Sequence, residues 1–497
     1  MRISKSKFVA GCQCVKRLYW QVHEPELAAE PDAADQAIMQ QGHEVGMLAR
    51  QLFPGGVEVR NDRGLDDAIR ATRELATNRE IPAIFEGVFE HDGVLVKVDI
   101  LQRRSDSRWR LIEVKSSTSV KEEHLDDVAI QYRAVSGSGL DIGSCCLAHV
   151  NRNYVFRGGM VDPWRFFRIR NVTRQVEKLQ PKLTFQLRAQ FTVLNMANAP
   201  EIATGPHCTN PVTCEFFDRC NPPRPVDHIG YLPRLHANAA EELEEMGIES
   251  IRDVPDDFEL TEIQRRAATC VQTGEPWYDF DGLKAALAGL PYPLFFMDFE
   301  TVNPAIPCFA NMRPYDHLPF QWSVHAQKEP SAEPEHHEFL AMDGTDPRRE
   351  FITSLCAALA ENGSIVVYNA TFESQRLTEL ATWFPEHAAQ IENIKSRLWD
   401  LLPVVRNHVY HPAFAGSYSL KSVLPALLPE MSYEDMLVGN GPDAGLAWGS
   451  LVRGGLDCGE RDKIRKGLLE YCRQDTLALV KIVTRLRLIS TGFTRCD

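Results

Sequence analysis

The segment LFFMDFET (residues 294–301) is an apolar run that closes with two acidic residues. Its length and composition are typical of a β-strand in an α/β domain. Because side chains alternate between the two faces of a strand, Asp298 and Glu300 point the same way. Two carboxylates on one face can hold a divalent cation through hard oxygen ligands. The segment therefore predicts a strand and the first half of a metal site.

Two later segments extend this pattern. IVVYNATFESQRL (residues 365–377) indicates a strand, a turn and the start of a helix that carries Asn369 and Glu373. LLEYCRQDTLALV (residues 468–480) is helical in pattern, and its Tyr471 and Asp475 lie four residues apart. Residues at this spacing share one face of a helix. The three segments together predict a cluster of acids drawn from a strand and two helices.

In chain order, element type and spacing these segments resemble the RNase H-like (DnaQ-like) exonucleases of the DEDD class. Tyr471, four residues before Asp475, is similar to the tyrosine of the DEDDy subtype, and GSYSLKSVLPAL (residues 416–427) resembles the helix between the second and third motifs of that class. Glu373 stands where that class has aspartate, and Asp400 is an alternative for the same role. The resemblance implies that two Mg²⁺ or Mn²⁺ ions bind the scissile phosphate. It implies that Asp298, Glu300 and Asp475 are catalytic residues that bind metal. It implies that Glu373 and Tyr471 are catalytic as well.

A second set of charged residues lies in the first half of the chain. IFEGVFEHDGVLVKVDILQ (residues 84–102) alternates apolar and polar residues around a turn, which predicts a β-hairpin. The strand RWRLIEVKSS (residues 108–117) follows it. Asp99 falls near the end of one strand, and Glu113 and Lys115 share a face of the next. Two acids beside a lysine can hold a metal ion and stabilise charge that develops on a phosphate; the alternative is a surface charge pair.

This arrangement resembles the active site of RecB-like PD-(D/E)XK nucleases. The resemblance implies catalytic roles for Asp99, Glu113 and Lys115, with the two acids as metal ligands, and supporting roles for Glu86, Gln131 and Tyr132. The helix QQGHEVG (residues 40–46) resembles one that carries a metal-binding histidine in that group. Here Gly46 occupies the aligned position, with His43 and Glu44 as weaker substitutes.

Three cysteines, Cys208, Cys214 and Cys220, follow this region at equal intervals. Together with CVKRLYW (residues 14–20) they resemble the split cysteine set of iron–sulfur RecB-like nucleases, which are akin to the exonucleases of CRISPR adaptation. The resemblance implies a 4Fe-4S cluster held by Cys14 and these three thiols. Cys12 is the alternative fourth ligand, and a Cys₃His zinc site with His207 is the alternative centre.

Length, charge and cysteine usage complete the prediction. The 497 residues indicate several domains: a RecB-like PD-(D/E)XK nuclease domain (1–225) with a restriction-endonuclease-like core, a connector (226–288) and an RNase H-like α/β domain (289–497). The connector is either helix–hairpin–helix-like or a plain acidic linker. The chain has no apolar run long enough to span a membrane and no secretory signal, and its 13 cysteines indicate a reducing cytoplasm.

The net charge of −14 disfavours binding of nucleic acid by bulk charge. Residues 151–190 are locally basic, however, and are either a solvated helix face or a phosphate track. We therefore expect a metal-dependent DNA nuclease that acts on single strands or ends, in DNA repair or defence against foreign DNA, with a helicase or another DNA-processing protein as partner. The alternatives are an RNA-trimming 3′ exonuclease and a catalytically silent nucleic-acid-binding scaffold. The basic residues of 151–190 are Arg152, Arg157, Arg165, Arg168, Arg170, Arg174, Lys178, Lys182 and Arg188.

Overall fold

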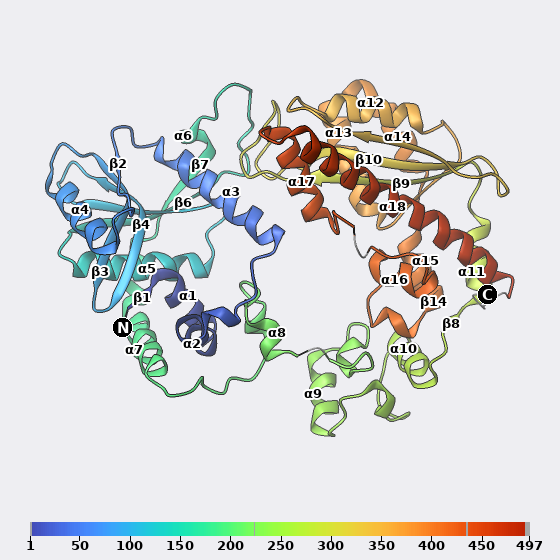
Figure 1. Cartoon of the computed structure of the whole chain (residues 1–497), viewed down its shortest axis with the longest axis horizontal. Coiled ribbons are helices and arrows are strands. Elements are labelled where there is room, and N and C mark those ends of the chain that lie inside the picture. The colour runs from blue at the N-terminus through green and yellow to red at the C-terminus, as the bar shows by residue number, and fades with distance from the viewer. Residues whose placement is uncertain (1, 223, 434–435, 493–497) are drawn as a thin grey trace. The chain divides into compact units, whose positions relative to one another are not determined.

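A computed structural model describes residues 2–222, 224–433 and 436–492 (Figure 1). The protein is a mixed α/β molecule in two compact units. Unit 1 spans Met1–Pro222 and Asn303–Asp316, and unit 2 spans Pro223–Val302 and His317–Asp497. The predicted connector (226–288) therefore belongs to unit 2, and a loop from the middle of the chain belongs to unit 1.

The loop Asn303–Asp316 is held to unit 1 by hydrogen bonds to main-chain carbonyl groups. The backbone N–H of Phe156 donates to the carbonyl of Met312 at 2.9 Å. The Tyr315 hydroxyl donates to the carbonyl of Ser116, directly after the predicted nuclease strand. This loop directly follows the strand that carries Asp298 and Glu300. The chain therefore leaves unit 2 at Val302, contributes the loop to unit 1, and returns to unit 2 at His317.

Unit 1 is built on a mixed sheet with the strand order β2-β3-β4-β5-β6-β7, to which β1 adds by pairing with β4 (Figure 1). The predicted hairpin is β3–β4, and its turn residues Asp92 and Gly93 both have positive φ, as a tight hairpin turn requires. The strands are β1 (Ile3–Ser4), β2 (Val57–Glu58), β3 (Ala83–His91), β4 (Val94–Arg103), β5 (Trp109–Lys115), β6 (Ile142–Val150) and β7 (Phe167–Asn171).

Helices cover both faces of this sheet. One core contains apolar residues of α5 and α7, including Val128 and Leu183, packed with Leu111 and Leu147 of the sheet. A second core lies between α3 and the opposite face of the strands. The helices are α1 (Lys5–Gln13), α2 (Val15–His23), α3 (Ala33–Arg50), α4 (Leu65–Thr77), α5 (Glu122–Gly137), α6 (Pro163–Phe166), α7 (Thr173–Leu194) and α8 (Phe217–Cys220).

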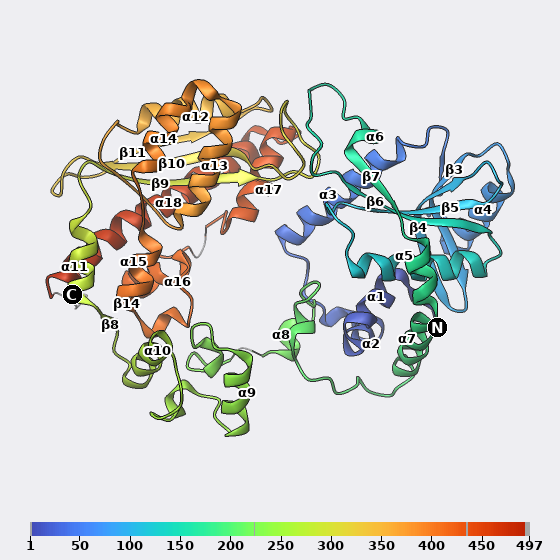
Figure 2. The same cartoon turned by 180° about the vertical axis from the view of Figure 1, so that it is seen from behind.

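Unit 2 contains a second mixed sheet with the order β11-β10-β9-β12-β13 (Figure 2). The strand predicted from LFFMDFET is β9, at the centre, antiparallel to β10 and parallel to β12. A short ribbon of β8 and β14 lies apart from this sheet. The strands are β8 (Trp277–Tyr278), β9 (Leu294–Val302), β10 (Leu318–Gln327), β11 (Glu335–Leu340), β12 (Ser364–Val367), β13 (Leu398–Asp400) and β14 (Val409–Tyr410).

Alternation along β9 separates two cores. Phe295, Met297 and Phe299 pack with α12, α13 and α14 on one face. Leu294 and Phe296 pack on the other face in a core that includes α18, so Asp298 and Glu300 face α18. The helices are α9 (Ala237–Glu245), α10 (Glu262–Thr273), α11 (Phe280–Ala288), α12 (Arg348–Ala358), α13 (Ala370–Trp383), α14 (Ala388–Ser396), α15 (Leu401–His408), α16 (Leu420–Leu427), α17 (Gly441–Arg453) and α18 (Cys458–Ser490).

The predicted connector is partly integrated into unit 2. Its helix α10 buries Ala267, Ala268 and Val271 in the same core as α18. Its helix α9 belongs to a small separate cluster around Leu243. Among the helices of the described residues, none combines the length and hydrophobicity needed to cross a membrane.

Candidate active sites

An acidic cluster lies between the central strand of unit 2 and its longest described helix. Asp298 and Glu300 come from β9, and Asp475 comes from α18. One carboxylate oxygen from each residue lies within 4.8 Å of the others. The structure thus brings together three of the acids that the sequence assigned to metal binding, from positions more than 170 residues apart.

Burial makes this cluster electrostatically costly. Desolvation, with repulsion from Asp475, raises the pKa of Glu300 to about 8. Desolvation likewise raises the pKa of Asp475 to about 6, although a hydrogen bond from Tyr433 opposes the shift. The pKa of Asp298 is also raised, through burial and the charges of its acidic neighbours. A divalent cation would remove this repulsion, so the donor set and its burial fit a metal site.

Glu373 lies at the start of α13 and is 2% exposed. Burial raises its pKa to about 8. Its Oε2 is buried without a hydrogen-bond partner among the described residues. Its negative charge helps to raise the pKa of Asp298. It is not part of the group of three acids within 4.8 Å. Glu373 Oε2 is therefore free to support metal binding by the three acids.

The alternative residue, Asp400, accepts backbone hydrogen bonds at two helix starts. Its Oδ1 accepts from the backbone N–H of Asn369 at 2.9 Å and of Leu402 at 3.0 Å, and its Oδ2 accepts from Ala370 at 3.0 Å. It therefore caps the N-termini of α13 and α15. Asn369 adopts positive φ at the start of α13, so its backbone sets the turn that leads to Glu373.

Two further residues belong to this site: Tyr433, which carried no sequence signal, and Lys421, which lies in the segment GSYSLKSVLPAL but was assigned no role. The Tyr433 hydroxyl donates to Asp475 Oδ1 at 2.6 Å. The positive charge of Lys421 lowers the pKa values of both Glu300 and Asp475. Tyr471 lies one turn before Asp475, and burial with the nearby acids raises its pKa strongly. The phenol therefore stays protonated at working pH and serves as a hydrogen-bond donor.

A second candidate site lies in unit 1 around Glu113, which is almost fully buried. Its Oε1 accepts from Lys5 at 2.8 Å and from Lys115 at 2.9 Å, and its Oε2 accepts from Gln131 at 2.7 Å. Asp127 on α5 pairs with Lys115 from the other side. Gln131 thus lies at the predicted site, and Lys5, from α1, was absent from the prediction.

Asp99 lies on the neighbouring strand β4, where its Oδ2 accepts from the backbone N–H of Val114 at 2.7 Å. Burial and the charge of Glu113 raise the pKa of Asp99 to about 7. Burial also acts to raise the pKa of Glu113, but Lys5 and Lys115 outweigh it and hold this pKa well below the usual range. The pKa values of the two acids are therefore shifted in opposite directions, and in this arrangement lysines supply the positive charge that a metal ion would bring.

A pocket of about 320 Å³ opens onto these residues, and its lining includes Asp99, Glu113, Lys115 and Glu86. Glu86 pairs with Arg50 at 2.6 Å and with Lys97 at 2.9 Å. The lining also includes His43 and Gly46 of α3, whereas the Glu44 carboxylate accepts from Gln40. A Cβ built on Gly46 would meet nothing within 4 Å. Tyr132 packs against the apolar core instead.

The four cysteines of the predicted cluster line one pocket, together with His207 and Trp20. Cys14 lies at the junction of α1 and α2, and the backbone N–H of Cys214 donates to the carbonyl of Cys208 at 2.9 Å. Cys12 is not in this lining and packs toward Gln190 of α7. Among the described residues, no three cysteine sulfurs lie within 4.8 Å of one another. The structure therefore does not bring the predicted cysteine ligands together as tightly as one metal ion would, since four Zn–S bonds of about 2.3 Å place the sulfurs roughly 4 Å apart.

Comparison with known proteins gives two matches. Residues 295–419 match the model of a domain of unknown function, DUF2779. The chain is 25% identical over 206 residues to "Uncharacterized protein MG366" of Mycoplasma genitalium, a match that covers 38% of this chain and 31% of that protein. The chain thus spans about a third of this relative. The matched domain begins at β9 and includes Glu373, but it ends before α18.

Proposed function

We propose that this protein is a metal-dependent nuclease that hydrolyses phosphodiester bonds, with its main active site at Asp298, Glu300 and Asp475. The observation that supports this function is the convergence of three carboxylates within 4.8 Å, of which those of Glu300 and Asp475 are buried and that of Asp298 is partly buried. Acids at this distance repel one another unless they are protonated or share a cation. The first pair lies on a strand, Glu373 opens a helix and Asp475 lies on the last described helix, as the resemblance to RNase H-like DEDDy exonucleases implies.

The residues divide the catalytic work as follows. Asp298, Glu300 and Asp475 would hold Mg²⁺ or Mn²⁺, which supplies Lewis acidity to a phosphate. Tyr471, held protonated, donates a hydrogen bond that orients the attacking water. Tyr433 fixes the rotamer of Asp475 through its 2.6 Å hydrogen bond. Lys421 balances part of the negative charge and so keeps the acids available as ligands.

Cleavage in Mn²⁺ tests this proposal. Wild-type protein should shorten end-labelled single-stranded DNA, and Asp298→Ala should abolish the shortening because the cluster loses a ligand. Tyr471→Phe should slow cleavage by about 10²-fold, the usual magnitude for loss of one positioned proton donor, and it should leave Mn²⁺ binding unchanged. Cleavage by Asp298→Ala at the wild-type rate would contradict the proposal for this site.

The second candidate site supports a PD-(D/E)XK nuclease function for unit 1. Glu113 and Lys115 lie 2.9 Å apart beside Asp99, above a pocket that is open to a ligand. In this function Lys115 stabilises negative charge on the phosphate, and Gln131 and Lys5 hold Glu113 in place. The cysteines at the ends of this domain would hold a 4Fe-4S cluster as a structural staple.

We favour single-stranded DNA or DNA ends as substrate, in repair or defence against foreign DNA in the cytoplasm, with a helicase or a similar DNA-processing protein as partner. Two alternative functions would give different results in the cleavage experiment. An RNA-trimming 3′ exonuclease would cleave RNA through the Asp298 site and show no dependence on Lys115. A silent scaffold would bind nucleic acid in a salt-dependent manner and cleave neither substrate in Mg²⁺ or Mn²⁺.

A further inference from the structure

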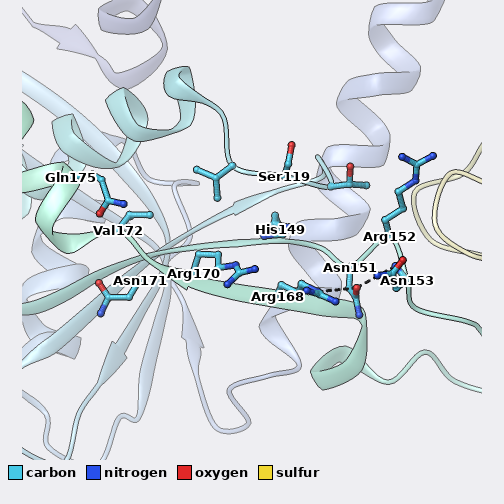
Figure 3. Close-up of a pocket in the computed structure, with 12 residues that line it drawn as sticks. Ser119, His149, Asn151, Arg152, Asn153, Arg168, Arg170, Asn171, Val172 and Gln175 are labelled. Carbon is cyan, nitrogen blue, oxygen red and sulfur yellow. Dashed lines mark hydrogen bonds between the residues drawn. The ribbon is translucent and has the colours of Figure 1, made fainter.

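Unit 1 contains a basic pocket beside the Glu113 site (Figure 3). Its volume is about 460 Å³, and its side chains come from the segment after β5, from β6 and β7, and from the start of α7. Figure 3 shows Arg168 and Arg170 on β7 near His149, with the hydrogen bond from Arg168 to Asn151 drawn as a dashed line. The described lining contains these three arginines and no acidic residue: Arg152, Arg168 and Arg170.

The positive charge of this pocket is largely uncompensated. Among the described residues, the side chains of Arg152 and Arg170 form no ion pair or hydrogen bond. At the base of the pocket His149 is 5% exposed, and its Nδ1 contacts the carbonyl of Val150 at 3.1 Å, whereas its Nε2 has no partner in the described chain. In a protein with a net charge of −14, a cavity with free arginines and no carboxylate is a selective site for an anion.

Strand register places this pocket next to the candidate nuclease residues. Lys115 of β5 pairs with His149 of β6, which pairs with Arg168 of β7. Residues paired across a sheet point to the same face, and neighbouring strands are about 4.8 Å apart. Lys115, His149 and Arg168 therefore form a row roughly 10 Å long, the scale of one or two nucleotides of a single strand.

A second pocket of about 340 Å³ adjoins the first, because Asn151 and Asn153 line both. Its lining adds Arg157, Arg165 and Trp164. Trp164 is 66% exposed, which is unusual for a large aromatic side chain. An exposed indole beside arginines is the combination that binds single strands, because bases stack on the ring while cations hold the phosphates.

We propose that these two pockets form a binding surface for single-stranded nucleic acid, in which Arg168 and Arg170 hold phosphates and Trp164 stacks on a base. The inference rests on the proposed nuclease function of unit 1 and specifies its substrate as a single strand. In this proposal only the pocket-lining residues of the basic stretch 151–190 contact the nucleic acid directly. A duplex, whose bases are already stacked, cannot use the Trp164 platform.

Fluorescence anisotropy of a labelled single-stranded oligonucleotide in EDTA tests this surface without cleavage. We expect the double variant Arg168→Gln/Arg170→Gln to weaken binding at least tenfold and to lower the slope of log affinity against log salt by about 1.4, because two phosphate contacts are lost. The matched control is Arg174→Gln/Arg188→Gln, which removes the same charge from exposed sites of α7 outside both pockets. It should weaken binding less than about threefold.

Trp164 gives an independent measurement. Trp164→Ala should weaken binding of the single strand about tenfold with no change in salt slope and no effect on the duplex, and Trp164→Phe should restore most of the affinity. Equal losses in the pocket and control variants would overturn the proposal in favour of a diffuse basic surface. Unchanged binding by Trp164→Ala would overturn the stacking role.

Failure of this inference and failure of the proposed function are distinguishable. Specific binding in EDTA without cleavage in Mn²⁺ would refute the nuclease function and retain the binding surface. Cleavage that persists while the pocket variants bind like wild type would refute the surface alone. Inorganic phosphate should compete with the strand in wild type and not in the double arginine variant; equal competition in both would place the phosphate contacts elsewhere.

Discussion

The ionisation of Glu300 links the acidic cluster to both stability and metal binding. Its pKa is about 8 in the folded chain, against an ordinary value of 4.5. The folded state therefore holds a proton that the unfolded state releases, and this stabilisation is fully present below about 4.5 and lost as pH rises through about 8. A divalent cation binds the ionised form, so its stabilising effect grows over the same range.

Glu300→Gln tests this linkage. Wild-type protein without metal should melt at a lower temperature at pH 8.5 than at pH 6, and Mn²⁺ should raise the melting temperature more at pH 8.5. The neutral glutamine removes the repulsion and a ligand, so the variant should melt several degrees higher than wild type at pH 8.5 in EDTA and respond little to Mn²⁺. Glu470→Gln, exposed on α18, is the control. An equal Mn²⁺ response in wild type and Glu300→Gln would contradict this assignment.

Gly46→His tests the metal assignment in unit 1. Gly46 lines the pocket beside Asp99 and Glu113, and a Cβ there meets nothing within 4 Å. We expect the histidine to add a nitrogen ligand and to lower the Mn²⁺ concentration needed for Lys115-dependent cleavage by severalfold. Gln40→His, at an exposed position of the same helix outside the pocket lining, is the control. A Mn²⁺ requirement unchanged by Gly46→His would argue against a metal at Asp99.

Several residues of both sites could not be predicted because their partners are distant in the chain. Lys5 reaches Glu113 across 108 positions, and Tyr433 reaches Asp475 across 42. No local spacing signals such pairs. Asp298, Glu300 and Asp475 were predictable because alternation and helical spacing fix their faces. Tyr132 was assigned beside Gln131, but the helix turns it toward the core.

At the scale of secondary structure, predictability followed hydrophobic pattern. The apolar runs at β9 and β12 were predicted. The strands β7, β11 and β13 were not, because FRIRN and EHHEFL are rich in charged or polar residues and β13 has three residues. Charged edge strands such as β7 are recognisable only from their pairing.

Asp400 links two helices and yields a prediction at this scale. Asp400→Ala should destabilise unit 2 by about 1–2 kcal/mol because α13 and α15 lose their shared N-cap. Asp400→Asn, whose side chain can still accept these hydrogen bonds, should cost much less. Chemical denaturation measures both, and both variants should keep the Mn²⁺-induced rise in melting temperature. Loss of that rise in Asp400→Asn alone would instead assign Asp400 as a metal ligand.

The junction of α1 and α2 and the segment around α8 provide the cysteines of the predicted cluster. Protein purified without oxygen should be brown, with broad visible absorption and about four irons per chain. Cys14→Ala should lose this colour, whereas Cys12→Ala should keep it because Cys12 lies outside the cysteine pocket. Colourless protein with one zinc per chain would contradict the iron–sulfur prediction.

At the scale of the whole molecule, the described residues form one candidate nuclease site in each compact unit. The domain boundary expected at residue 225 lies close to Pro222, where the first segment of unit 1 ends. The exchange of Asn303–Asp316 into unit 1 was not predictable, because nothing in that loop distinguishes it from a local turn. Each unit has its own cores, so each site should survive inactivation of the other.

The most direct test of a nuclease with two active sites is one digestion experiment. Single-stranded DNA and RNA, labelled at either end, are incubated in Mn²⁺ with wild type, Lys115→Ala, Asp298→Ala and the double variant. We predict that each single variant removes a different part of the product pattern and that the double variant cleaves nothing, with the label position reporting the polarity of each site. Identical products from all four proteins, or no cleavage by wild type, would contradict the account.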